Sequence, residues 1–314
     1  MKSICCIAFI LCCLAGTAQK TETYYDYAWR PCEPTRARFY STLEKTDSGW
    51  LRYDYFLAGQ KLQMKALFAD SACKIYNGQT IFVHANGRVA SVGRQLFNKQ
   101  TGVCVSYHSN GMMSDSATYS YGRPVGIKMG WWPNGTPSDS VAHVNDSMDV
   151  EISWFDNGAP SQAGFWLNGN RHGKWKFFHR NGQLAALEAY DRGRPLSITY
   201  FKEDGSVQTD TSNVNKKASF QKEEYDWMNW LSKKLYWPNG YQFTNGDQAV
   251  VVLEITLTEE GKVENVEVAT PFHPAFDKIA LDIVRRSPNW NPSISHNRKI
   301  KSTLRQPITF RQEE

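Results

Sequence analysis

The sequence has few of the features that mark enzymes or metal-binding proteins. Seven cysteines occur in 314 residues, four of them within the first 13, and the other three match no zinc-site spacing. No strained G-x-S-x-G elbow is present, and neither His108 nor His143 has a cysteine or carboxylate at ligand spacing. We therefore expect no catalytic site, no metal and no cofactor.

A strong charge imbalance is also missing. The formal net charge is +5 and the pI about 8.7, and no long basic run occurs before residue 210. Nucleic-acid binding is therefore not expected. A hydrophobic content of 41% over this length suffices for two ordinary domains. Aromatic residues make up 13% of the chain, and such large rings suit a thin β-structure that must bury area.

No apolar run is long enough to cross a bilayer, which needs about 20 residues. The longest, residues 4–14, follows Lys2 and precedes the small residues Gly16 and Ala18. This pattern predicts a signal peptide over residues 1–18, cleaved before Gln19, and no stable membrane span afterwards. An uncleaved inner-membrane anchor and a lipoprotein are the alternatives, but Cys12 and Cys13 lack the small preceding residue of a lipidation site. Cleavage leaves Cys32, Cys73 and Cys104, and their pairing stays open.

What the sequence does contain is a regular series of turn signals. Six pairs recur at intervals of 24, 24, 23, 24 and 23 residues: Asn86-Gly87, Asn110-Gly111, Asn134-Gly135, Asn157-Gly158, Asn181-Gly182 and Asp204-Gly205. Such pairs favour two-residue β-hairpin turns in which both central residues have positive φ. A fixed period of this size indicates a repeat architecture.

Each unit has further content. An aromatic residue stands three positions before the Asn or Asp in five of the six units, with Val83 as the exception, and glycine stands eight before it in four. Extension backwards to Ala58-Gly59 adds a weaker seventh unit. Each unit is predicted as strand, tight turn, strand, looser turn. The pattern resembles the MORN-type repeat over residues 48–210, which implies an antiparallel β-hairpin ladder, with residues 19–47 as its cap.

After a polar linker at residues 211–218, the chain predicts a small α-β-β-α-β domain over residues 219–314. A helix begins near Ser219, and residues 249–258 alternate as a strand, with a second strand after the turn at Gly261. Another helix follows Pro274 with apolar residues at helical spacing. The last strand, residues 304–311, contains Pro307, which confines it to a sheet edge or a bulge. The whole chain is thus predicted to be mainly β, with an α+β C-terminal domain.

This second half resembles the TonB C-terminal domain over residues 219–311. The resemblance rests on the helix ending before Pro238, the turn glycine Gly261 and the Pro-x-Trp-x-Pro exit formed by Pro288, Trp290 and Pro292. It implies a non-enzymatic periplasmic module that binds an outer-membrane receptor, or another envelope protein, by pairing an extended segment with an edge strand. The edge-strand residues that the resemblance implies for partner binding are Leu304, Arg305, Gln306, Ile308, Thr309 and Phe310.

The chain departs from a working TonB, which has a permanent anchor and a long Pro-rich spacer. Here 13 prolines are scattered, and the repeats stand where the spacer would be. We therefore expect the ladder to act as a scaffold that presents the domain at a distance. Two alternatives stay open: a ladder that binds glycan or protein, with the domain as a docking tag, and a true energy transducer if the N-terminus is an uncleaved anchor.

Two surface features leave open what the partner is. Seven basic residues and no acidic one occur from residue 285 to residue 311: Arg285, Arg286, Arg298, Lys299, Lys301, Arg305 and Arg311. They are either a solvated edge or a patch that attracts acidic receptor segments or cell-wall glycan. Similarly, Trp131, Trp132 and Trp154 are either ladder packing or sugar-stacking rings.

Overall fold

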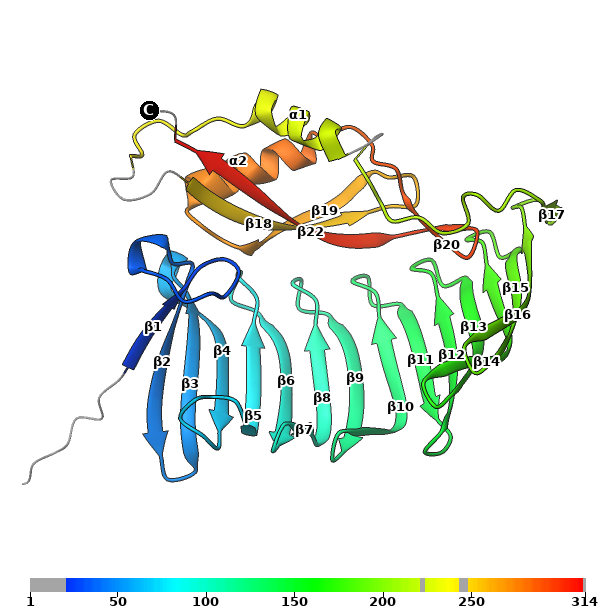
Figure 1. Cartoon of the computed structure of the whole chain (residues 1–314), viewed down its shortest axis with the longest axis horizontal. Helices are drawn as coiled ribbons and strands as arrows, with labels where there is room; N and C mark the ends of the chain where they lie inside the picture. Colours follow the sequence, from blue (N-terminus) through cyan, green and yellow to red (C-terminus); the bar gives the residue numbers. More distant parts are fainter. Residues whose placement is uncertain (1–20, 221–223, 243–247, 313–314) are drawn as a thin grey trace, which may run out of the picture.

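The structure, a computed structural model, describes residues 21–220, 224–242 and 248–312. It is mainly β and has two parts, a long curved ladder of strands and a small α+β domain that lies along one side of the ladder (Figure 1). The predicted signal peptide lies outside the described residues. Both predicted parts are present, which confirms the fold class.

The ladder is a seventeen-stranded sheet in which consecutive long strands pair antiparallel, from β1 with β2 to β16 with β17. Two short 3₁₀ helices, η1 (Pro34–Arg36) and η2 (Ala58–Gln60), interrupt its N-terminal part. The strands are β1 (Thr21–Tyr25), β2 (Phe39–Thr46), β3 (Gly49–Phe56), β4 (Lys61–Phe68), β5 (Tyr76–Val83), β6 (Val89–Leu96), β7 (Lys99–Gln100), β8 (Gly102–Tyr107), β9 (Met113–Ser120), β10 (Arg123–Trp131), β11 (Pro137–His143), β12 (Met148–Trp154), β13 (Pro160–Leu167), β14 (Asn170–Phe178), β15 (Leu184–Asp191), β16 (Arg194–Phe201) and β17 (Val207–Gln208).

The Asn-Gly turns differ from the prediction. In each, only the glycine has positive φ, for example 88° at Gly87, and the loop between the paired residues His84 and Arg88 holds three residues. The asparagine keeps a negative φ because its Oδ1 accepts the N–H two residues on, as Asn86 does from Arg88 at 3.0 Å. Two-residue turns with two positive φ values occur at the opposite ends of the strands, as at Tyr121-Gly122.

Side chains at these turns bond each unit to the next. The amide nitrogen of the turn asparagine donates to the carbonyl just before the next turn asparagine, as Asn134 does to Asp156 at 2.8 Å. The ring nitrogen two residues before that asparagine donates to a carbonyl of the next unit, as in His108 to Trp131 at 2.7 Å. The other members of the two series start from Asn86, Asn110, Asn181, His84, Trp132 and His179. The sequence period is therefore also a hydrogen-bonding period.

One face of the ladder carries its buried side chains. In the C-terminal part, Trp175, Phe177 and Ala186 are fully buried, with Trp166 and Tyr190 packed against them. A Cβ on Gly164 would overlap the indole ring of Trp175, so a glycine is required where that ring crosses β13. The indole of Trp175 thus lies close against the main chain of β13.

The C-terminal domain has the predicted α-β-β-α-β order with one addition. Its sheet has the strand order β19-β18-β22. A short hairpin, β20–β21, lies in a stretch for which the sequence predicts a loop. The described part of the first helix begins at Glu224. The elements are α1 (Glu224–Lys234), β18 (Gln248–Leu257), β19 (Val263–Thr270), α2 (Pro274–Arg285), β20 (Ser293–Ser295), β21 (Arg298–Ile300) and β22 (Ser302–Arg311).

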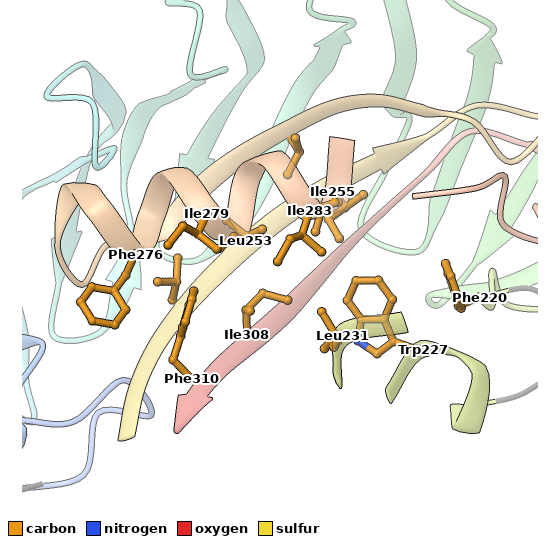
Figure 2. Packing of buried hydrophobic residues seen from close by; sticks show 14 of the residues in the cluster. Phe220, Trp227, Leu231, Leu253, Ile255, Phe276, Ile279, Ile283, Ile308 and Phe310 are labelled. Atoms are coloured by element: carbon orange, nitrogen blue, oxygen red, sulfur yellow. The ribbon is translucent and has the colours of Figure 1, made fainter. Parts of the chain in front are cut away.

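The core of this domain follows from the alternation of β18. Its side chains at every second position, from Ala249 to Leu257, are completely buried. Figure 2 shows Phe276, Ile279 and Ile283 of α2 over this face, with Ile308 of β22 beside α1. Both helices cover the same side of the sheet, and the ladder lies on the other side (Figure 1).

The domain folds back over the ladder, so in this structure the ladder does not present it at a distance. The guanidinium of Arg38, just before β2, stacks on the Phe272 ring between β19 and α2 at 4.1 Å. The hairpin β20–β21 contacts β13 to β16, which lie 96 or more residues away along the chain. The predicted linker and the residue after it are held as well, by isolated bridges of Lys216 with Ile294 and of Ser219 with Asn291.

Candidate partner-binding edge and its contact with the ladder

The edge strand β22 pairs on one side only. It runs antiparallel to β18 from Ser302, opposite Leu257, to Arg311, opposite Gln248. Within the described ranges no other strand pairs with it. The residues that the sequence singled out thus lie on a sheet edge, where a row of main-chain N–H and C=O groups is open to another strand.

Side chains of the edge strand divide between two faces. Ile308 and Phe310 point into the core and are 0% and 1% exposed, and Leu304 lies on the same face. Arg305 and Thr309 lie on the opposite, exposed face, where Arg305 donates to Glu254 of β18 at 3.0 Å. A partner at this edge therefore meets main-chain groups and the exposed face, while the apolar side chains are already occupied.

Pro307 fixes which main-chain groups face outward. Proline has no N–H, so it is tolerated in a strand where its nitrogen faces away from the neighbouring strand. The Gln306 amide donates to the Pro307 carbonyl at 3.3 Å, on that same open side. Because outward-facing residues alternate, Thr303, Arg305, Thr309 and Arg311 also present their N–H and C=O groups to the open edge.

The motif residues shape the domain. The N–H of Trp290 donates to the Gly261 carbonyl at 2.7 Å, and a Cβ on Gly261 would overlap the Trp290 carbonyl oxygen. Trp290 is 6% exposed and packs on Trp227 with ring centroids 5.2 Å apart. Pro288 and Pro292 flank it, and Pro238 is buried after α1. The structure thus brings Gly261 and Trp290 together, at the end of the sheet rather than at its open edge.

The seven basic residues do not form one patch. Arg298 is only 6% exposed and donates to the Gln162 side chain of the ladder at 2.9 Å. Lys301 bonds the carboxylates of Asp156 and Glu264. The remaining five are exposed: Arg285, Arg286, Lys299, Arg305 and Arg311. Neither interpretation of the sequence described Arg298 and Lys301, which bind the ladder of the same chain.

The tip of the hairpin β20–β21 rests on the aromatic cluster of the ladder. His296 and Asn297 form a turn with φ values of 50° and 62°. The His296 ring stacks on Phe177, with centroids 3.7 Å apart and planes 6° from parallel. Its Nδ1 lies 2.7 Å from a Glu188 oxygen, and Asn297 donates to the Phe201 carbonyl at 2.8 Å.

Hydrogen bonding defines the protonation state of this contact. Nη1 of Arg171 lies 3.1 Å from Nε2 of His296, and a guanidinium can only donate, so Nε2 accepts and Nδ1 carries the proton toward Glu188. Burial raises the pKa of Glu188, but hydrogen bonds from His296 and Tyr190 outweigh it, so this pKa lies below its usual value. A neutral imidazole thus joins a carboxylate to a guanidinium.

Two arginines are buried without an acidic partner among the described residues. Desolvation, together with the nearby charge of Arg171, lowers the pKa of Arg298 to about 10. Desolvation likewise lowers the pKa of Arg38 to about 10 at the other end of the domain. Their partners are carbonyl, hydroxyl and amide oxygens and aromatic rings. Both contacts between domain and ladder therefore contain a desolvated cation, which is costly.

Asp156 is the centre of an ion-pair network between ladder and domain. It lies in the turn after β12 and accepts from Arg180 and Lys301, which in turn reach Glu259 and Glu264 of the domain at 2.8 Å and 2.7 Å. Desolvation raises the pKa of Asp156, but the two cations outweigh it and lower this pKa. The network joins one ladder turn to both ends of the β18–β19 turn.

These contacts were missed by sequence reasoning. The one available signal is Glu188, a charged residue on a buried face of β15 beside aromatic neighbours. The three tryptophans considered for sugar stacking are half-buried, and Trp132 donates to the Trp154 carbonyl at 3.0 Å with Lys301 near its ring. Trp132 thus contributes to the packing of the ladder.

Comparison with protein families agrees with this architecture. Residues 243–312 match the family described as Gram-negative bacterial TonB protein C-terminal, and residues 171–191, in β14 and β15, match the MORN repeat variant family. Among curated proteins, none matches the chain. In the part of the chain that the structure covers, no helix combines the length and apolarity needed to cross a membrane.

Proposed function

We propose that this chain, which carries a TonB C-terminal domain behind a MORN-type repeat, is a non-enzymatic adaptor of the bacterial envelope. It captures an extended segment of an outer-membrane receptor as an added strand at the edge of β22. The observation that carries this proposal is the unpaired side of β22 in a domain whose family suggests an envelope protein.

The chemistry of the edge suggests what segment it takes. Main-chain pairing supplies affinity, and pockets or charges on the exposed face supply specificity. That face carries Arg305, Thr309 and Arg311, and Arg305 shares its charge with Glu254. An acidic, extended segment fits it best. Since Pro307 cannot donate, such a segment pairs on both sides of Pro307 and loses one hydrogen bond there.

The location that we propose is the periplasm, after cleavage of residues 1–18. The alternative is an energy transducer whose N-terminus remains as an anchor. Mass spectrometry of the mature protein separates the two, because a chain that starts at Gln19 has lost the apolar segment, whereas an intact Met1 retains it.

Strand capture is tested with an acidic ten-residue peptide from the N-terminal segment of an outer-membrane receptor. Thr309→Pro removes one outward N–H without touching the bonds to β18, and it should weaken binding about fivefold to tenfold. Thr309→Ala keeps the N–H and is the matched control. Deletion of residues 219–311 should abolish capture. Equal binding by the proline and alanine variants would contradict pairing at this edge.

A second candidate is binding by the ladder itself, favoured by one observation. A groove of about 570 Å³ crosses β4 to β8. Its lining includes Leu67, Val92 and Val103 with the polar groups of Gln79 and Arg94, and contains no acidic residue. Val103→Lys would fill this groove and should abolish ladder binding while leaving capture at β22 unchanged.

A further inference from the structure

The contact between hairpin and ladder bears directly on the edge strand, because the two are adjacent in the chain. The hairpin ends at Ile300 and β22 begins at Ser302, so only Lys301 lies between them. Lys301 is held by Asp156 of the ladder and Glu264 of the domain. The residue just before the edge strand is therefore tied to a ladder turn.

We propose that the ladder positions the edge strand for capture. The docking site, defined as Asp156, Ser161, Gln162, Phe177 and Glu188, holds the hairpin, and the hairpin fixes the start of β22. This inference rests on the proposed function and adds a role for the ladder within it. The ladder thereby becomes part of the binding apparatus, although it does not touch the captured segment.

Fixing the start of β22 matters because strand addition needs a straight, ordered edge. Two of the outward-facing residues, Thr303 and Arg305, lie two and four positions after Lys301. If the hairpin is free, the chain from residue 293 to residue 301 has lost its ladder contacts, and the captured segment must order this end of the edge as it binds. When the hairpin is docked, this end of the edge strand is already ordered before the segment binds.

The docking is also of a kind that can open. Apart from the stacking of His296 on Phe177, its contacts are polar: a carboxylate to an imidazole, a carboxylate to a lysine, and a guanidinium to neutral oxygens. The Nε atoms of Arg298 and Arg171 are buried without a hydrogen-bond partner. Polar interfaces between domains of one chain ordinarily permit relative motion. We therefore expect a free state of the hairpin beside the docked one, with the edge fully prepared only in the docked state.

By thermodynamic linkage the effect is reciprocal. If docking strengthens capture by a given factor, a captured segment strengthens docking by the same factor. A receptor segment at β22 thus tightens the hold of the ladder on the hairpin, which carries the signal of capture into the repeats.

The test combines two changes that leave the edge strand itself intact. His296→Gly removes the imidazole but keeps a residue suited to positive φ, and Asp156→Ala removes the carboxylate that holds Lys301. The double variant should bind the acidic receptor peptide about fivefold to tenfold more weakly than the natural chain. Lys299→Ala, an exposed change on the same hairpin, is the matched control and should bind within twofold of the natural chain.

A second measurement shows whether the hairpin has been released. Amide hydrogen exchange in residues 293–300 and in β13 to β15 should become faster in the double variant, while α2 keeps its protection. The inference is overturned if peptide affinity is unchanged although the hairpin is released, or if exchange is unchanged in the double variant. Failure of the natural chain to bind the peptide would instead contradict the proposed function, and the exchange result would still report on docking.

Discussion

The close approach of Gly261 to Trp290 makes a sharp prediction for Gly261→Ala. Gly261 has φ of +78°, in the left-handed region that an L side chain adopts at a cost of about 1 kcal/mol or more. A Cβ there would lie 2.7 Å from the Trp290 carbonyl carbon and overlap its oxygen. Because the obstacle is backbone, no side-chain rotation relieves the contact.

The loss of stability in Gly261→Ala can be worked out from the groups that the new Cβ displaces. Displacing the Trp290 segment breaks its hydrogen bond to Gly261, worth about 1 kcal/mol, and loosens the indole from Phe220 and Trp227, worth about 2 kcal/mol or more. With the backbone cost the total is about 4 kcal/mol. That is a large part of the stability of a small domain, and it corresponds to a fall in melting temperature of roughly 15 °C or more.

Gly240→Ala is the matched control for this prediction. Gly240 has a similar φ of +83° in the same domain, but nothing lies within 4 Å of a Cβ there. It should lose only the backbone cost, about 1 kcal/mol. Differential scanning calorimetry of the full chain measures both variants. If Gly261→Ala lowers the transition of the C-terminal domain no more than Gly240→Ala, the close approach to Trp290 is refuted.

Two further predictions concern the ladder. Asn134→Ala removes the bond to Asp156 in the next unit and the bonds from the N–H and hydroxyl of Thr136 within its own turn, so it should lower the free energy of unfolding by about 1–2 kcal/mol in calorimetry. Asn157→Ala, whose one bond at the turn is from Ala159, should cost about half as much. Glu188 has a pKa below its unfolded value of about 4.5, so it stabilises the folded, docked state above pH 4.5 and loses that effect as pH falls through the lower folded pKa. Glu188→Gln should therefore flatten the acid dependence of hairpin docking, measured as the pH profile of fluorescence. An unchanged profile in this variant would contradict the prediction.

Much of the ladder was predictable because its information is local and repeated. The interval between turns predicted two strands per unit. The alternation of residues along each strand predicted which side chains share a face of the sheet. The turn type was predicted wrongly, since the rule for Asn-Gly pairs considers only φ. Asn86 shows the competing effect: its side chain bonds the main chain two residues on and holds φ negative.

The C-terminal domain was predictable for a different reason. The alternation of β18 and the helical spacing of α2 each follow from burial on one face, and both are visible in sequence. The contact of His296 with Glu188 was not, because the two residues are 108 positions apart and no local pattern links them. A contact between domains depends on the final shape of both, which no local pattern encodes.

The two contacts at opposite ends of the domain have a consequence for the evolution of the repeat array. Arrays of stacked units commonly gain or lose a unit without harm, because each unit touches only its neighbours. Here one added unit would contribute two strands, and at about 4.8 Å per strand it would lengthen the arc between Arg38 and the docking site by roughly 10 Å. The domain could then reach Arg38 or the docking site but not both. We therefore expect that the length of the domain limits the number of repeats in the ladder.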